Sequence, residues 1–131
     1  MTFKPLDIDI YNPVVPYVRM TQRGKYVKPD AIRYLQAQKD LKSLMVLAKR
    51  NVECFEDYYV PEKEPFMVGV QFYTAKAHQC DLDNLVKAIL DAGQGVLYKD
   101  DRYADKITAI RIKTESEPHV RLIITPMEEK K

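Results

Sequence analysis

Five aspartates fall between Asp81 and Asp101, together with one asparagine and two lysines. Asp81 and Asp83 flank Leu82, so where an extended chain enters a helix their carboxylates can converge on one cation while Leu82 points inward. Asp100 follows a turn that contains glycine and directly precedes Asp101. Carboxylates brought together repel one another and lose hydration, and a hard divalent cation relieves both costs. The segment therefore predicts a Mg2+ site, with Mn2+ as a plausible substitute, and metal-assisted phosphate chemistry.

Lys87 lies four residues after Asp83 and four before Asp91. Next to a metal site its ammonium could stabilise charge that develops on phosphoryl oxygens. Two simpler interpretations remain open. Lys87 could only form i,i+4 ion pairs on a helix surface, and Asp81 with Asp83 could only cap a helix. Capping, however, explains one carboxylate and not four.

Length and composition predict one compact domain over residues 1–131, because 131 residues with 46% hydrophobic content suffice for one core. The charge is unevenly distributed. Residues 1–50 hold ten Lys and Arg against four Asp and Glu, whereas residues 51–131 hold eleven against fifteen. A basic first part suits a polyanionic partner, and an acidic second part suits a metal site.

The segment 17–28 carries four basic residues and no acidic residue. Positive charge without interleaved acid is what neutralisation of DNA phosphates requires, although such a cluster can also be an ordinary solvated surface. The segment predicts an exposed arm or hairpin that turns near Gly24. Its candidate DNA-binding residues are Arg19, Arg23, Lys25 and Lys28.

Hydrophobic periodicity predicts an α+β fold. The predicted strands are 6–10, 66–74, 107–113 and 120–125, and the predicted helices are 29–50 and 83–92. The apolar stripe of the first helix is expected to contain Ile32, Leu35, Leu41, Leu44, Met45 and Leu47, and the apolar face of the second Leu85, Ala88, Ile89 and Ala92. The last two strands are expected to pair antiparallel, because only a short polar loop separates them. The expected architecture is a mixed sheet of four or five strands with two helices on one face.

The acidic motif resembles that of the RusA family of Holliday junction resolvases. Its pattern is D-L-D-N-L-x-K, then D-A, a glycine turn and L-Y-K-D-D, and the basic segment R-M-T-Q-R-G-K-Y-V is similar to the family's amino-terminal arm. The motif residues are Asp81, Leu82, Asp83, Asn84, Leu85, Lys87, Asp91, Ala92, Gly95, Asp100 and Asp101. The chain departs from the family pattern at 78–80, where a more basic or proline-containing segment is expected.

The resemblance implies a homodimer of bacterial or phage origin that makes paired, Mg2+-dependent nicks in four-way DNA junctions during recombination or repair. It places the metal-binding carboxylates at Asp81, Asp83 and Asp101, and the motif lysine at Lys87. Asp100 is a further candidate ligand. The predicted catalytic residues are thus Asp81, Asp83, Lys87 and Asp101.

The alternative function is a non-catalytic dimer that binds junctions or other branched DNA and keeps the acidic cluster as a structural metal site. Other classes are disfavoured. Cys54 and Cys80 have no C-x-x-C spacing and no basic, apolar leader precedes them, which predicts a reduced cytoplasmic protein. The apolar stretches are too short to cross a bilayer. An EF-hand loop starting at Asp81 would need glycine where Val86 stands.

Overall fold

The computed structural model describes residues 5–11, 29–52, 60–75 and 81–127. These residues form an α+β fold of four strands, two α-helices and one 3-10 turn. In chain order the elements are β1 (Leu6–Ile10), α2 (Pro29–Arg50), β2 (Phe66–Thr74), α3 (Leu82–Gly93), η2 (Asp101–Tyr103), β3 (Ala104–Lys113) and β4 (His119–Pro126). The first strand, the first helix and the strand at 66–74 have the predicted bounds. None of the described helices is both long enough and apolar enough to cross a membrane.

The four strands form one mixed sheet in the order β1-β4-β2-β3. β4 lies between β1 and β2 and is antiparallel to both, whereas β2 and β3 are parallel. The prediction that residues 107–113 and 120–125 pair with each other is therefore wrong. The reason is α3, which carries the chain back along the sheet, so that β3 starts at the same end as β2 and pairs parallel to it.

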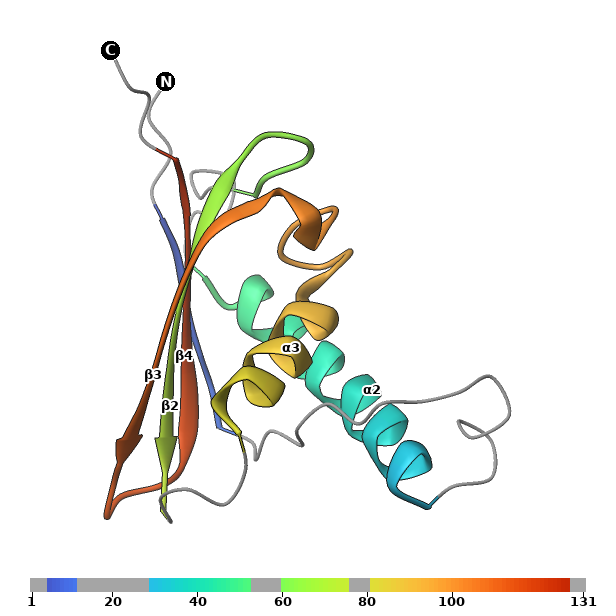
Figure 1. Cartoon of the computed structure of the whole chain (residues 1–131), viewed down its shortest axis with the longest axis vertical. Helices are drawn as coiled ribbons and strands as arrows, with labels where there is room; N and C mark the ends of the chain where they lie inside the picture. The colour runs from blue at the N-terminus through green and yellow to red at the C-terminus, as the bar shows by residue number, and fades with distance from the viewer. Residues whose placement is uncertain (1–4, 12–28, 53–59, 76–80, 128–131) are drawn as a thin grey trace.

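Both helices pack on one face of the sheet, as predicted (Figure 1). Alternate residues of three strands point into the layer between sheet and helices and are buried. The apolar face of α3 is the one expected from its periodicity. Its buried residues include Leu85, Ala88, Ile89 and Ala92, which are at most 4% exposed. This face fixes which side of α3 must point to solvent.

The long helix α2 buries a narrower stripe than its sequence predicts. Ile32 and Leu47 were expected in the apolar stripe, but they are 48% and 52% exposed. Leu41 and Met45 of the expected stripe are buried, and so are Ala31 and Tyr34, which were not expected in it. The stripe is narrow because, among the described elements, α2 packs mainly against α3 and β1. Tyr34, a residue with a polar end, thereby lies at the interface between the two helices.

A tight turn follows α3 and is organised by Tyr98. The ring of Tyr98 is buried and stacks on Phe66 with 5.0 Å between centroids. Its hydroxyl donates to the carbonyl of Leu90 at 2.6 Å. A Cβ added at Gly93 would lie only 2.7 Å from this hydroxyl, so the close approach requires glycine. Gly95, with φ of 84°, then reverses the chain.

We therefore expect Gly93→Ala to lower the free energy of unfolding by about 1 to 3 kcal/mol, because the added methyl group overpacks against a ring held in place by Phe66 and Leu90. Urea denaturation measures the effect. Gly69→Ala is the matched control: its Cβ would meet Thr108 Oγ1 at 3.5 Å, an ordinary contact, so its stability should be unchanged or slightly higher. Equal stability of the two variants would contradict this account of the turn.

Candidate functional site

The start of α3 presents two exposed carboxylates. Asp81 occupies the N-cap position with φ of −69° and ψ of 136°, but its side chain makes no capping hydrogen bond. Asp83 lies in the first turn, where its Oδ1 accepts from the backbone N–H of Asn84 at 3.0 Å. Leu82 between them is half-buried and packs against the core, as predicted. The simple capping interpretation of Asp81 is therefore wrong, and both carboxylates face solvent beside the positive end of the helix dipole.

Lys87 lies on the outer face of α3 and pairs with Asp91. Its ammonium is 3.1 Å from Asp91 Oδ1 and 3.4 Å from Asp91 Oδ2. The two side chains are 50% and 31% exposed, so the pair contributes only about 0.3 to 0.5 kcal/mol before solvent screening. On this ground alone the ion pair is a minor stabilising contact.

A third residue, Tyr34 of α2, joins this pair from the other helix. Its hydroxyl donates to Asp91 Oδ2 at 3.2 Å, and the residue is only 2% exposed. A hydrogen bond to a charged acceptor contributes about 1.5 to 3 kcal/mol, more than an exposed ion pair. Asp91 is therefore oriented mainly by Tyr34. Tyr34 was not among the predicted site residues, because helical periodicity carries no information about a partner 57 positions away.

Asp100 and Asp101 lie at the start of η2 and differ in their partners. The side chain of Asp100 accepts from the backbone N–H of Arg102 at 3.0 Å and from its Nε at 2.9 Å. These bonds hold the pKa of Asp100 below its ordinary value, with the backbone bond contributing most. The pKa of Asp101 is instead raised, first by burial and then by the charge of Asp91, while Lys87 opposes the shift.

The four carboxylates predicted as metal ligands therefore form two pairs at different ends of α3. Asp81 and Asp83 stand at its start, whereas Asp100 and Asp101 follow the turn beyond its end (Figure 1). Among the residues that the structure describes, no three His, Cys, Asp or Glu side chains come close enough together to hold a metal ion. A parallel strand–helix–strand unit explains this, because its first strand ends where the helix begins and its second strand begins where the helix ends.

Two exposed carboxylates nevertheless suit the chemistry of Mg2+. This ion commonly uses one or two carboxylates and completes its octahedron with water and substrate phosphates. Asp81 and Asp83 offer hard oxygen donors of that kind, and Lys87 lies one turn further along the same helix. The side chains at the start of α3 therefore fit a divalent cation.

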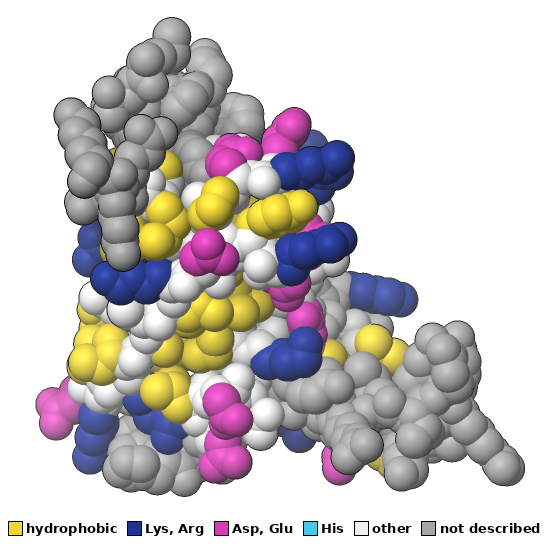
Figure 2. All heavy atoms as spheres, turned by 45° about the horizontal axis from the view of Figure 1, so that its top comes forward, with side chains coloured by type: hydrophobic (Ala, Val, Ile, Leu, Met, Phe, Trp, Pro, Cys, Tyr) yellow, Lys and Arg dark blue, Asp and Glu magenta, His cyan; other side chains and the backbone are white. Residues whose placement is uncertain are grey.

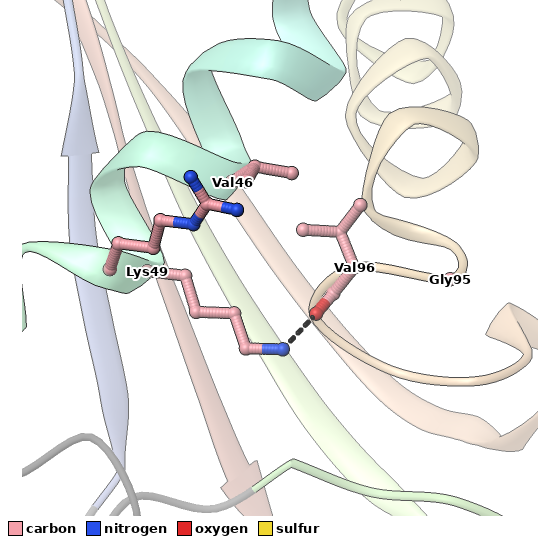
Figure 3. Close-up of a pocket in the computed structure, with 5 residues that line it drawn as sticks. Val46, Lys49, Gly95 and Val96 are labelled. Atoms are coloured by element: carbon pink, nitrogen blue, oxygen red, sulfur yellow. Dashed lines mark hydrogen bonds between the residues drawn. The ribbon is translucent and has the colours of Figure 1, made fainter.

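Side chains of α2 hold the turn that leads to Asp100 and Asp101. Gln38 donates to the carbonyl of Ala88, and Lys42 donates to that of Gln94 at 2.6 Å. Lys49 donates to the carbonyl of Val96 at 2.7 Å across a shallow hollow (Figure 3). That hollow is lined by Val46, Lys49, Arg50, Gly95 and Val96. The ammonium groups of Lys42 and Lys49 also compensate the dipole of α3 at its C-terminal end.

The polar residues of α2 could have been noticed in the sequence, because Tyr34, Gln38 and Lys42 recur every four residues. Such spacing marks one side of a helix. It could not, however, have shown which element that side meets.

The predicted DNA-binding residues Arg19, Arg23, Lys25 and Lys28 lie outside the described residues, as does the segment 78–80. On the described part of the face drawn in Figure 2, basic and acidic side chains lie next to each other around a hydrophobic patch. The described part of that face is thus mixed in charge.

A sheet covered on one face by two helices, with acidic side chains and a lysine on the outer surface of one helix, is compatible with a metal-dependent hydrolase. Residues 15–125 match the family Endodeoxyribonuclease RusA. The chain therefore belongs to the RusA family, and the resemblance seen in the motif is confirmed. This also confirms the enzyme class, an endodeoxyribonuclease of a Holliday junction resolvase family. No curated protein matches the chain.

We expect Arg102→Gln to raise the pKa of Asp100 toward its ordinary value of 3.8, because the guanidinium is removed while the backbone N–H still donates. A carbon-detected NMR titration of the aspartate carboxylates measures this shift. Arg121→Gln is the control, since Arg121 pairs with Asp7 on the face of the sheet opposite the two described helices. An unchanged titration midpoint of Asp100 in Arg102→Gln would show that the guanidinium does not stabilise this carboxylate.

Proposed function

We propose that this protein is a Mg2+-dependent, structure-specific endodeoxyribonuclease that resolves four-way DNA junctions by paired nicks in recombination and DNA repair. The observation that carries the proposal is the family match over residues 15–125. The exposed pair Asp81 and Asp83 supports it, because two exposed carboxylates at a helix start suit a hard cation that also contacts a phosphate.

Asp81 and Asp83 are the proposed primary metal ligands. Asp101, which lies beyond the other end of α3 in this structure, stays the third carboxylate that the family resemblance implies. Asp100 ranks below Asp101, because two hydrogen bonds from Arg102 already engage its carboxylate. Mn2+ is expected to replace Mg2+, since both prefer oxygen ligands. These assignments divide the acidic motif into residues that hold the ion and one that orders the turn.

When bound, a divalent cation supplies Lewis acidity, which lowers the pKa of water and neutralises charge on phosphate oxygens. The chain's own contribution comes from α3. Lys87, whose side chain is half exposed, can donate to a non-bridging phosphate oxygen and stabilise charge that builds up in the transition state. Asp91 and Tyr34 orient that lysine. Asp81 and Asp83 fix where the phosphate must bind.

The proposed assembly is a homodimer, because twofold symmetry presents two equivalent sites to a junction in which two opposing strands are cut. The proposed unit is a single domain spanning residues 1–131, and the proposed location is the cytoplasm of a bacterial cell or of a phage-infected one. Arg19, Arg23, Lys25 and Lys28 are proposed to bind DNA phosphates. The alternative of a non-catalytic DNA-binding dimer has no observation in its favour.

We expect the protein to nick a labelled four-way junction symmetrically with Mg2+, and to leave a linear duplex of the same sequence intact. EDTA should abolish nicking. Asp83→Asn should abolish it as well while leaving junction affinity largely intact, because the change removes a metal ligand and no phosphate contact. Gel assays of cleavage and binding measure both properties.

Asp40→Asn is the charge-matched control for this experiment, since Asp40 is exposed on α2, and it should cut like the wild type. Tight junction binding by the wild type without cleavage would support the non-catalytic alternative instead. Loss of binding together with cleavage in Asp83→Asn would contradict the proposed division between metal ligands and DNA-binding residues.

The proposed DNA contacts of the segment 17–28 predict a change in salt dependence. Replacing Arg19 and Arg23 with glutamine should weaken junction binding and reduce the slope of log affinity against log salt by about 2, since each phosphate contact contributes about 0.9. Binding titrations at several salt concentrations measure the slope. Lys106→Gln with Lys113→Gln removes the same charge from β3 and should leave the slope unchanged. An unaltered slope in the Arg19 and Arg23 variant would remove this segment from the DNA interface.

A further inference from the structure

Lys87 has an acidic neighbour one helical turn away in each direction. Asp83 precedes it by four residues, and Asp91 follows it by four. Within the described part of the chain, the ammonium forms its ion pair with Asp91 and none with Asp83. The choice matters because Asp83 is a proposed metal ligand and Asp91 is not.

Within an isolated α-helix, the other ion pair, between Asp83 and Lys87, would be the more stable one. An acidic residue placed four positions before a lysine forms a better pair than one placed four positions after it, in agreement with the helix dipole. An isolated α3 helix would therefore favour the pair between Asp83 and Lys87. Something outside the helix must favour Asp91.

Tyr34 supplies that preference. Its buried hydroxyl donates to Asp91 Oδ2 at 3.2 Å, the same oxygen that lies 3.4 Å from the Lys87 ammonium. The bond fixes the Asp91 carboxylate on the α2 side of α3, with Oδ1 presented to Lys87 at 3.1 Å. Asp83, by contrast, accepts a local hydrogen bond from Asn84. The Asp91 carboxylate is therefore already oriented toward Lys87 by a tertiary hydrogen bond, whereas the Asp83 carboxylate is not.

A lysine that paired with Asp83 would interfere with metal binding in two ways. It would occupy a carboxylate oxygen, and it would place a positive charge next to the incoming cation, which is repulsive. The same ammonium on Asp91 lies toward the other end of α3.

We propose that Tyr34, acting through Asp91, is a positioning residue that keeps the Lys87 ammonium away from Asp83, so that the Asp83 carboxylate stays available to the divalent cation. This inference rests on the proposed function, because it takes Asp83 as a metal ligand. It assigns to α2, a helix outside the acidic motif, a part in setting metal affinity.

The test is a titration of the protein with Mn2+ alone, without DNA, followed by electron paramagnetic resonance of the unbound ion. Tyr34→Phe removes the hydroxyl and keeps the ring. We expect its dissociation constant for Mn2+ to rise about two- to fivefold, because Lys87 then pairs with Asp83 and competes with the ion. Tyr73→Phe is the matched control, since its hydroxyl donates to Gln71 away from α3, and its affinity should match the wild type.

A double-mutant cycle shows whether Lys87 mediates the effect. In a Lys87→Met background, Tyr34→Phe should cause no further loss of Mn2+ affinity. An equal loss with and without Lys87 would overturn the inference, because the hydroxyl would then act by another route. Unchanged Mn2+ affinity in Tyr34→Phe alone would overturn it as well.

Asp91→Asn provides an independent variant if Tyr34→Phe fails to fold, since Asp91 is partly exposed. It removes the charge that holds Lys87, so it should weaken Mn2+ binding by at least as much as Tyr34→Phe. Lys87→Met should again abolish the loss. A loss that persists in the Lys87→Met background would contradict the proposed competition.

Cleavage assays separate this inference from the proposed function. Raising Mg2+ should restore the junction-cutting rate of Tyr34→Phe, because its defect is one of metal affinity, but should not restore that of Lys87→Met. If Lys87→Met abolishes the effect of Tyr34→Phe on Mn2+ affinity but the wild type cuts no junction, the nuclease proposal alone is refuted. An additive cycle in an active nuclease would refute the positioning role alone, and a wild type that binds no Mn2+ would refute both.

Discussion

The buried ring of Tyr98 is the constraint on which the arrangement of the acidic motif depends. It stacks on Phe66 in the core of the sheet and donates to the carbonyl of Leu90. Its burial, and secondarily the charges of Asp101 and Asp91, raise the pKa of its hydroxyl, which therefore remains a donor. With this ring in place, the chain must turn tightly past Gly93 and return toward α3. The position of Asp101 beside Asp91 is a consequence of that turn.

The long helix α2 also positions the acidic motif. Hydrogen bonds from Gln38, Lys42 and Lys49 reach backbone carbonyls at the end of α3 and in the turn after it. Tyr34 reaches the side chain of Asp91 instead. The long helix thus supports both the backbone that carries the acidic motif and one of its side chains. The proposed role of Tyr34 would link metal affinity to the packing of these two helices.

The sequence was sufficient for features that depend on local periodicity. Alternation predicted the strand at 6–10, and the apolar spacing of α3 predicted the burial of Leu85 and Ile89. Strand order was not accessible, because a strand's residue pattern does not specify its neighbours. The pairing predicted for the last two strands was therefore wrong, since β2 lies between β3 and β4.

The site shows the same division. Residue types and spacing identified the acidic motif and its family, which the match over residues 15–125 confirms. They did not show that the carboxylates form two pairs, because that depends on how the chain returns after α3. Nor did they identify Tyr34, whose partner lies 57 positions away. The roles of Asp81, Asp83, Lys87 and Asp101 remain predictions.

The most direct test of the account is the anomalous diffraction of a crystal grown with Mn2+ and a four-way junction. If the start of α3 is the metal centre, an anomalous peak lies within coordination distance of the Asp81 and Asp83 carboxylates and next to a DNA phosphate. The Lys87 ammonium is then still paired with Asp91. A peak bound elsewhere on the protein, or none beside the phosphate, would contradict the claim that the start of α3 is the metal centre of a nuclease.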